Sequence, residues 1–399
     1  MRIAIFSDNF YPELTGIGDT VTMSAVELSK RGHQIHFFAP RYSAKDYGMA
    51  NLSEKEMGLG ENIKITRFFS LPYKTGTGQG RFVIPTCLRW INIKKFNPDI
   101  IHTHLPFGVG IEALVAARIL RKPLIGTNHT NYGVIRELSY YSFLPSGLFE
   151  KISTAYFNWY YKHCDLITSP AAFILETMRN HGVRRPSVVV HNPVDLATFN
   201  PLKSRSGIKR VFGLSHTAVA SAGRLAPEKK IEVIIKAVAI VKKKIPALTL
   251  GIAGHGIIED DLKELVKNLG LEDNVKFLGI LNKTELNGLY SASKMFIITS
   301  ISEVQSMTVL QAMASALPVI GVQAAGLEEY ITPGTGILVN PGDPEALAQK
   351  VIYLLRHPEV RRKLGRRGQN FVKKFAVTTI ADVWEKIYEK TIEEYNQKR

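Results

Sequence analysis

The sequence predicts an α/β protein built from two doubly wound domains, and three observations support this. The chain has 399 residues, which is too long for one ordinary core and suits two domains of roughly 200 residues. Short apolar runs alternate with amphipathic helical stretches, as in repeated βαβ units. Runs such as Ile100-Ile101 and Val188-Val189-Val190 are continuously apolar, which is typical of strands buried on both faces of a parallel sheet.

The first half of the chain is predicted to form one such sheet. Its expected strands are Arg2–Ser7, Gln34–Ala39, Ile63–Phe69, Asp99–Thr103, Pro123–Thr127, Asp165–Ser169 and Ser187–His191. Helical patterns fill the intervals, among them Asp19–Arg31, closed by Gly32, and Gly108–Leu120. This alternation predicts a Rossmann-like domain over residues 1–195.

The second half repeats the pattern. Its expected strands are Ala218–Ala222, Thr249–Ala253, Val275–Leu278, Met295–Thr299, Pro318–Gly321 and Ile337–Val339. A polar segment with Pro and Ser, from Asn192 to Lys209, suits a linker. We therefore expect a second Rossmann-like domain over 196–375, and a C-terminal helix over 376–399 that packs back on the first domain.

Composition narrows the function classes. The chain is 45% hydrophobic and 22% charged, as in a soluble globular protein, and no run of about 18 apolar residues predicts a membrane span. Two cysteines without a CxxC pattern favour a reducing cytosol and no zinc site. The net charge of +16 favours acidic partners such as phosphorylated substrates, anionic lipid or nucleic acid. The excess is +7 over residues 1–195 (22 minus 15) and +9 over 196–399 (29 minus 20), so a generally basic surface also explains it.

The most informative motif runs from Gly223 to Lys229, between an apolar strand and the helical pattern Ile231–Lys244. Glycine allows the backbone to approach a ligand. Arg224 can fork two phosphate oxygens, Lys229 can add a point charge, and a helix N-terminus adds free N–H groups. The motif predicts a diphosphate site, although an ordinary surface helix after a strand is the plainer interpretation.

A second motif lies about 75 residues later. Glu303 is followed eight positions on by Gln311, and Ser306 is a candidate N-cap for a helix over Met307–Ala316. Backbone N–H groups of Ser306, Met307 and Thr308 can therefore face a phosphate, while the Glu303 carboxylate can accept hydrogen bonds from sugar hydroxyls.

Together these segments resemble the retaining, family-4-type glycosyltransferases, most closely the bacterial enzymes that glycosylate diacylglycerol or phosphatidylinositol. The resemblance implies the GT-B fold, with two Rossmann-like domains facing each other across a cleft. It gives the first domain the acceptor and the second the nucleotide sugar. It matches the pattern G-R-L-x-x-E-K at Gly223–Lys229, but places Gln311 where the family pattern E-x7-E has its second Glu, which usually binds ribose hydroxyls.

The resemblance also assigns roles to residues at other strand ends. Catalytic roles fall to His129, Glu303, Arg224 and Lys229. Donor binding adds Gly16 and Gly18 after the first strand, Gly223, Gly254 and Gly256, Ser306, Met307, Thr308 and Gln311. His102 and His104 form an H-x-H pattern, and His104 is expected to line the acceptor site. No nearby acid or third ligand completes a metal set around these histidines.

The acceptor is expected at the part of the chain where the resemblance is weakest, residues 41–98 and 130–160. Tyr132 and Arg136 are the candidate acceptor residues. The segment from Tyr132 to Phe149 mixes aromatic and basic residues, which suits an anionic membrane surface. A loop and helix packed on the core explain the same residues equally well.

We therefore expect a metal-independent, retaining hexosyltransferase without a cofactor. It would move glucose or mannose from a nucleoside diphosphate sugar to a hydroxyl of a lipid or glycan acceptor. The expected location is cytoplasmic, with peripheral attachment to the inner face of the cell membrane as an extension. A sugar-nucleotide 2-epimerase and a non-catalytic sugar-nucleotide-binding protein remain as alternatives. A nucleic-acid binder would explain the charge, but no known nucleic-acid-binding motif occurs.

Overall fold

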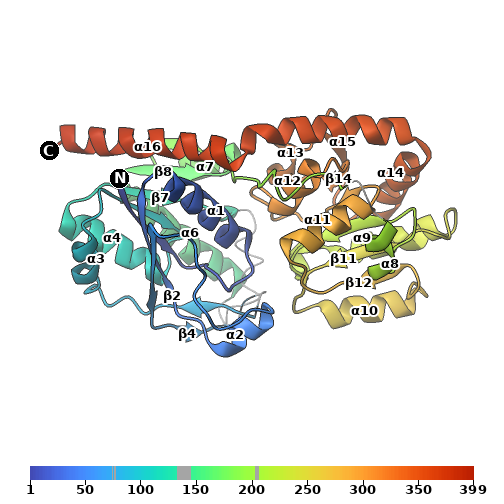
Figure 1. Ribbon diagram of the computed structural model, residues 1–399, viewed down its shortest axis with the longest axis horizontal. Coiled ribbons are helices and arrows are strands. Elements are labelled where there is room, and N and C mark those ends of the chain that lie inside the picture. The colour runs from blue at the N-terminus through green and yellow to red at the C-terminus, as the bar shows by residue number, and fades with distance from the viewer. Residues whose placement is uncertain (74, 76–77, 133–144, 203–205) are drawn as a thin grey trace. The chain divides into compact units, whose positions relative to one another are not determined.

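The computed structural model of the chain describes residues 1–399 apart from 74, 76–77, 133–144 and 203–205. It divides into two compact units, which are described separately (Figure 1). Unit 1 comprises Met1–Pro193 and Val377–Arg399, and unit 2 comprises Val194–Ala376. Both boundaries lie within two residues of those expected from the sequence.

Unit 1 is built on a seven-stranded, entirely parallel sheet with the order β3-β2-β1-β6-β7-β8-β9. Its strands are β1 (Arg2–Ser7), β2 (Gln34–Pro40), β3 (Ile63–Phe68), β6 (Ile100–His104), β7 (Leu124–Thr127), β8 (Leu166–Ser169) and β9 (Ser187–Val189). Each predicted strand of the first half overlaps one of them. The strand order reverses between β1 and β6, so the carboxyl ends of these two strands form the topological switch point at which doubly wound sheets bind ligands.

The helices of unit 1 connect and cover these strands. They are α1 (Gly16–Lys30), α2 (Ala44–Met49), α3 (Trp90–Phe96), α4 (Gly108–Leu120), α6 (Ser146–Lys162), α7 (Ala172–Asn180) and the C-terminal α16 (Val377–Gln397). One short antiparallel pair, β4 (Leu71–Pro72) with β5 (Arg81–Phe82), was not expected from the sequence.

The C-terminal helix completes the core of unit 1 after the chain has passed through unit 2. Figure 1 shows α16 in red running alongside the blue α1. Its Ile380, Ala381, Trp384 and Tyr388 join the buried cluster of β1, β2 and α1. At the end of α1, Arg31 donates to Asp382 and Glu385 at 2.6 Å each. The apolar face and this ion network together attach α16 to α1.

Unit 2 has a six-stranded parallel sheet with the order β12-β11-β10-β13-β14-β15. The strands are β10 (Val219–Ala222), β11 (Leu250–Ala253), β12 (Val275–Phe277), β13 (Phe296–Ile297), β14 (Val319–Val322) and β15 (Gly336–Val339). Every predicted strand of the second half overlaps one of these. The order reverses between β10 and β13, which places a second switch point beside Gly223 and the loop that carries Glu303.

The helical elements of unit 2 surround this sheet. They are α8 (Ser206–Val211), η3 (Pro227–Lys229), α9 (Ile231–Lys242), α10 (Glu259–Asn268), α11 (Lys283–Ala292), α12 (Met307–Ala314), α13 (Ala325–Glu328), α14 (Pro344–Arg356), α15 (Pro358–Val372) and η4 (Lys373–Phe375). From Pro344 onward the chain is nearly continuous helix, formed by α14, α15, η4 and then α16 of unit 1.

Candidate functional site

The phosphate-site candidates of unit 2 follow four neighbouring strands. Gly223 follows β10, Gly254 follows β11, Glu303 follows β13, and Gly326 lies beside them in α13, directly after β14. Since the carboxyl ends of parallel strands share one sheet edge, the fold brings these four elements together.

Close backbone contacts explain the glycines at this edge. A side chain at Gly254 would meet the Gly223 carbonyl oxygen at 1.9 Å, and its φ of +131° disfavours other residues. At Gly256 a side chain would meet the Leu225 carbonyl at 2.1 Å, and at Gly326 that of Glu303 at 1.8 Å. The loop after β10 is therefore packed directly on the loop after β11, and the Glu303 loop on α13.

Arg224 is held by a carboxylate that the sequence analysis left without a role. Its Nη2 donates to Oε1 of the buried Glu228 at 2.7 Å. The Nε of Arg224 is buried and has no hydrogen-bond partner among the described residues. The guanidinium is thus fixed on one side and retains an unused donor, a geometry in which a further anion can bind.

Lys229 and Glu303 form the closest ion pair of the site, with Nζ 2.6 Å from Oε1. The Glu303 side chain is only 12% exposed. Burial alone would raise its pKa, but the Lys229 ammonium and hydrogen bonds from Ser300 and Ser306 outweigh burial and hold the pKa below its usual value. We name Arg224, Glu228, Lys229 and Glu303 the cation–carboxylate site.

The structure corrects the position of Lys229 relative to a helix start. Pro227–Lys229 is a single 3₁₀ turn, Lys230 has a left-handed φ of 53°, and α9 begins only at Ile231. The N–H of Lys229 is already bonded to the Ala226 carbonyl at 2.9 Å. Lys229 therefore contributes its ammonium group, and not the free N–H of an α-helix.

The start of α12 lies as predicted, with Ser306 at the N-cap and Met307 and Thr308 in the first turn. Its chemistry differs in one respect, because the Ser306 hydroxyl makes no cap bond and lies 3.0 Å from Oγ1 of Thr308. The Ser306 N–H is taken by the Tyr330 hydroxyl at 2.9 Å. The Ser306 N–H is therefore not available to a ligand.

Gln311 lies one turn further along α12 and is 5% exposed. Its Oε1 is buried and has no hydrogen-bond partner among the described residues. A buried amide oxygen without a donor is costly, and such groups mark positions where a ligand donor can be accommodated. This is the position at which the family resemblance expects a contact to ribose.

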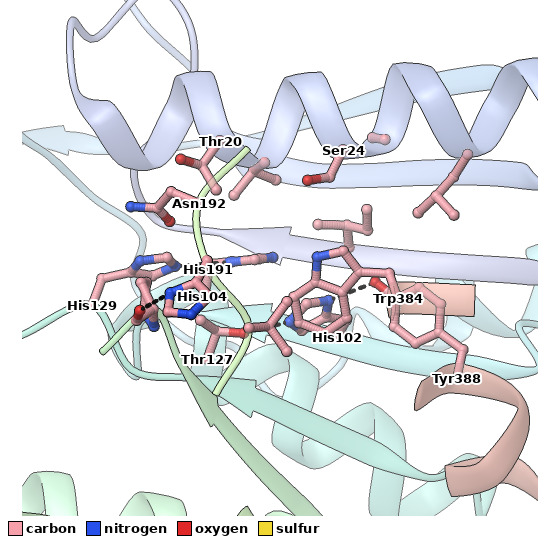
Figure 2. Close-up of a pocket in the computed structure, with 16 residues that line it drawn as sticks. Thr20, Ser24, His102, His104, Thr127, His129, His191, Asn192, Trp384 and Tyr388 are labelled. Carbon is pink, nitrogen blue, oxygen red and sulfur yellow. Dashed lines mark hydrogen bonds between the residues drawn. The ribbon is translucent and has the colours of Figure 1, made fainter. Parts of the chain in front are cut away.

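The histidines of unit 1 form a second cluster, at the ends of β6 and β7 (Figure 2). His104 Nδ1 lies 3.0 Å from His129 Nε2, and the His102 ring packs on the His104 ring at 4.1 Å. His102 is itself held between the Tyr388 hydroxyl at 2.8 Å and Thr127 Oγ1 at 2.6 Å. These three rings, which we name the histidine cluster, line a pocket with Thr20 and Ser24 of α1, Asn192, and Trp384 and Tyr388 of α16.

Burial keeps the histidine cluster neutral. It lowers the pKa of His102 to about 3 and that of His129 to about 4, and for His102 the nearby His129 adds to the effect. The pKa of His104 is also lowered well below its usual value, by burial and then by both neighbouring rings. In a neutral His–His pair one ring donates and the other accepts, so the His104–His129 bond leaves each ring with one further nitrogen for a hydrogen bond.

Other predicted residues of unit 1 lie differently from expectation. Gly16 and Gly18 belong to the first turn of α1, and not to a loop before it, since Thr15 caps the helix by accepting from the Gly18 N–H at 3.2 Å. Tyr132 is buried, and its hydroxyl donates to Asn158 Oδ1 at 3.2 Å, which argues against contact with an acceptor. Arg136 lies outside the described residues, as does most of the segment Tyr132–Phe149.

Comparison with known proteins identifies the family. Residues 14–198 match the family described as Glycosyltransferase Family 4, and residues 211–371 match Glycosyl transferases group 1. The chain belongs to the family-4-type glycosyltransferases. Its two units are the two Rossmann-like halves of the GT-B fold, and it is a hexosyltransferase by family.

Curated relatives of this glycosyltransferase include lipid-modifying enzymes. It is 28% identical over 333 residues to the alpha-monoglucosyldiacylglycerol synthase of Streptococcus pneumoniae, covering 80% of this chain and 70% of that protein. The protein of the same name from Acholeplasma laidlawii is 24% identical, with 100% and 99% covered.

A solved structure supports the fold assignment. The Anabaena protein HepE, in complex with UDP-glucose, superposes with a TM-score of 0.75 at 19% identity, covering 98% of this chain and all of that one.

Within the described residues, no helix combines the length and apolar character of a membrane span, and no group of three or more His, Cys, Asp or Glu side chains is arranged to hold a metal ion.

Two residues of the glycosyltransferase, Glu228 and Tyr388, were given no role from the sequence. Glu228 stands four positions after Arg224, which is a spacing for ion pairs in a helical turn and could have indicated its role. Tyr388 bonds a histidine 286 positions away, and no local pattern signals such a contact.

Proposed function

We propose that this glycosyltransferase moves a hexose, glucose or mannose, from a nucleoside diphosphate sugar to a hydroxyl group of a membrane lipid, with retention of anomeric configuration. The observation that carries the proposal is the cation–carboxylate site at the switch point of unit 2. Its two cations are positioned by two carboxylates, so that a diphosphate can bind without the side chains having to be ordered first. The curated relatives that synthesise monoglucosyldiacylglycerol support a lipid acceptor.

In this proposal the second unit binds the donor. Arg224 and Lys229 neutralise the diphosphate as it leaves, with the first turn of α12 (Ser306, Met307 and Thr308) and the close backbone of Gly223, Gly254 and Gly256 as the other donor-binding elements. Stabilisation of developing charge by fixed donors is usually a large catalytic contribution. Glu303 accepts from hydroxyls of the transferred sugar, and Gln311 accepts from the ribose.

The first unit binds the acceptor. Gly16 and Gly18 are the residues of this unit proposed to contact the donor phosphates, and His129 is proposed to bond the transferred sugar, with His104 as its partner. The acceptor oxygen forms a bond to the anomeric carbon on the face from which the phosphate leaves. The bond from that carbon to the phosphate oxygen breaks, and the acceptor proton passes to the leaving phosphate. No metal ion or cofactor takes part in this scheme.

The test is transfer from UDP-glucose and GDP-mannose to diacylglycerol in mixed micelles, with the anomeric configuration of the product assigned by NMR. We expect an α-linked glycolipid and unchanged rates in EDTA. Arg224→Ala should slow transfer, and Arg362→Ala, an exposed arginine of unit 2, is the matched control. A β-linked product, or loss of activity in EDTA with rescue by magnesium, would contradict the mechanism. Nucleotide binding without any turnover would favour a non-catalytic binding protein.

A further inference from the structure

The short β4–β5 ribbon of unit 1 exposes large apolar side chains to solvent. Phe69, Leu71 and Tyr73, in and beside β4, are exposed, and so are Phe82 and Ile84, in and beside β5. Phe69 is 67% exposed, more than any other phenylalanine described as exposed. In most half-buried strands the outward face is polar. Here the outward face carries large apolar side chains at every second position.

Of the residues between them, Pro72 is exposed, but two others are buried. Ser70 and Val83 are buried, and the Val83 backbone lies so close to Gly108 of α4 that a side chain there would meet its carbonyl at 1.7 Å. Leu71 pairs directly with Phe82 across the ribbon, so their side chains share one face.

The chain continues this apolar face beyond the ribbon. Leu88, before α3, is 65% exposed, and Ile91 in the first turn of α3 is exposed as well. We name Phe69, Leu71, Tyr73, Phe82, Ile84, Leu88 and Ile91 the apolar ribbon surface. Seven large exposed apolar residues within one segment exceed the scattered single residues of an ordinary surface and indicate an interaction site.

The ribbon is attached firmly to the body of unit 1. The Gln79 amide donates to the Pro12 and Asp46 carbonyls at 3.2 and 2.7 Å and accepts from the Leu14 N–H at 3.2 Å. Arg81 donates to Ser43 Oγ at 2.8 Å and pairs with Asp46. The apolar ribbon surface is therefore held beside the loop that leads from Pro12 into Gly16 and α1, where the proposed function places the reacting groups.

The segment of the chain that forms this surface carries only positive charge. Residues 62–98 contain seven cations and no acid. These cations are Lys64, Arg67, Lys74, Arg81, Arg89, Lys94 and Lys95. Three arginines of this set pair with carboxylates from elsewhere, namely Glu56, Asp46 and Glu112.

The exposed cations near the surface are Lys94 and Lys95 on α3, Lys45 on α2, and Arg41 shortly before α2. Arg41 is tied to the base of the ribbon, since its N–H donates to the Phe68 carbonyl at 2.7 Å. The result is an apolar centre with cations on both flanks, which matches the acyl region and the anionic headgroups of a bilayer.

We propose that the apolar ribbon surface, flanked by Arg41, Lys45, Lys94 and Lys95, is where this chain docks on an anionic lipid bilayer. The inference rests on the proposed function in one respect, the lipid acceptor, and it identifies the surface that would contact the bilayer containing that lipid. Docking here would bring the bilayer next to the start of α1, so that a lipid hydroxyl reaches the site while the acyl chains stay in the membrane.

A second exposed apolar stripe provides an internal comparison. Leu148, Ile152 and Trp159 are exposed on one face of α6, but that helix carries Glu150 beside Lys151 and Lys162. It lacks the one-sided charge, so the ribbon is favoured and α6 becomes a competing outcome of the test.

The experiment measures co-sedimentation of the full chain with vesicles of equal parts phosphatidylglycerol and phosphatidylcholine, without donor. Phe69→Ser combined with Leu88→Ser should lower the partition coefficient about tenfold or more, because two large apolar groups no longer leave water. Val211→Ser combined with Ile257→Ser, at exposed apolar positions of unit 2, should change it less than about twofold, within the range of ordinary surface substitutions.

The charge arm uses Lys94→Glu with Lys95→Glu, for which we expect about a tenfold loss or more at low salt. Arg362→Glu with Lys363→Glu changes the net charge equally at exposed positions of α15 and should have little effect. Raising salt should shrink the effect of the Lys94 and Lys95 change and leave the apolar effect in place. Equal losses in test and control pairs would overturn the proposal, because net charge alone would then explain binding.

Other outcomes are equally decisive. Binding that depends on Ile152→Ser and Trp159→Ser, and not on the ribbon, would move the surface to α6. No binding to anionic vesicles would overturn the inference. Glycolipid formation in detergent micelles would in that case leave the proposed function standing. Vesicle binding that depends on the ribbon, without transfer to any acceptor, would support the docking surface and contradict the proposed function. Melting curves confirm that each variant is folded.

Discussion

The cation–carboxylate site and the histidine cluster occupy equivalent places in the two units yet use opposite electrostatics. Both lie at the carboxyl ends of parallel strands beside a switch point. In unit 2 the side chains are ions, and each cation is held by a carboxylate at 2.6–2.7 Å. In unit 1 the side chains are rings that burial keeps neutral.

The difference teaches what each edge can bind. Paired ions can exchange one anion for another, so unit 2 suits a charged diphosphate. Neutral imidazoles donate and accept hydrogen bonds without attracting a counter-ion, so unit 1 suits uncharged hydroxyls. If this comparison is correct, substitutions in the two units should affect different steps.

The largest effect is expected for Lys229→Ala. Loss of one fixed donor to a developing charge typically slows catalysis about 10²–10³-fold. The substitution also leaves the buried Glu303 carboxylate unpaired, which costs roughly 3 kcal/mol of folding stability. Steady-state kinetics and thermal melting measure the two effects.

The double variant Lys229→Ala with Glu303→Gln separates them. It removes both charges, so the melting temperature should return toward that of the original protein, while transfer stays lost. Recovery of activity in the double variant would show that Lys229 acts only by neutralising Glu303, and the diphosphate assignment would fall.

The next effect is expected for His129→Ala. Loss of one hydrogen bond to a sugar hydroxyl should slow transfer roughly tenfold to a hundredfold, and binding of free UDP or GDP in calorimetry should stay nearly unchanged. His216→Ala, an exposed histidine of unit 2, is the control. A collapse of nucleotide affinity in His129→Ala would mean that the histidine cluster also binds the charged nucleotide, against the comparison.

The sheets of both units could be predicted from sequence, because buried parallel strands are continuous apolar runs and leave a pattern within a few residues. The motif Gly223–Lys229 and the pair Glu303 and Gln311 were found for a similar reason, since each lies in a short segment after a strand. The start of α1 was placed at Asp19 instead of Gly16, because glycine is a poor helix former and the Thr15 cap was overlooked.

The remaining features depend on contacts that no local pattern records. The β4–β5 ribbon was missed because its alternation exposes apolar residues, the opposite of what strand prediction assumes. The histidine cluster depends on Tyr388, which α16 brings back from the end of the chain. Tyr132 was assigned to the acceptor because aromatic residues look similar in sequence whether they are buried or exposed.

The third prediction concerns pH and tests the neutrality of the histidine cluster. A histidine whose folded pKa is depressed binds fewer protons than in the unfolded chain, so its contribution is complete above pH 6.5 and is lost as pH falls toward the folded value. For His102 the folded value is about 3. Between pH 6.5 and 5, acidification should therefore lower the free energy of unfolding through His102 by up to about 1.4 kcal/mol per pH unit.

The variant His102→Gln isolates this contribution, since glutamine can still bond Tyr388 and Thr127 but does not titrate. Its stability should fall less steeply on acidification than that of the original protein. Asp8, whose pKa is raised by burial to about 7, acts in the opposite direction, but it is present in both proteins and cancels. Parallel curves of unfolding free energy against pH would mean that His102 is not buried as a neutral ring.

The smallest effect is expected for Gln311, and its direction tests whether unit 2 reads only charge. Its buried Oε1 lacks a donor in the described part of the chain, so replacement by Leu should stabilise the free protein slightly. The same change should weaken UDP or GDP binding about three- to tenfold, the worth of one neutral hydrogen bond.

Gln311→Glu should have the opposite effect on both stability and nucleotide affinity. A buried carboxylate without a partner destabilises the free protein, but its stronger bond to a ribose hydroxyl raises nucleotide affinity by a similar factor.

Calorimetry measures the nucleotide affinity, and melting temperatures with and without nucleotide report the stability of the free and bound protein. If both variants bind nucleotide as the original does, the unpaired oxygen serves no ligand, and recognition in unit 2 is confined to its ion pairs. If Gln311→Leu weakens nucleotide binding and Gln311→Glu strengthens it, the amide oxygen of Gln311 is a ligand contact. The chain then has a neutral hydrogen-bond acceptor at a position where a carboxylate would bind the nucleotide, and therefore the nucleoside diphosphate product, more tightly.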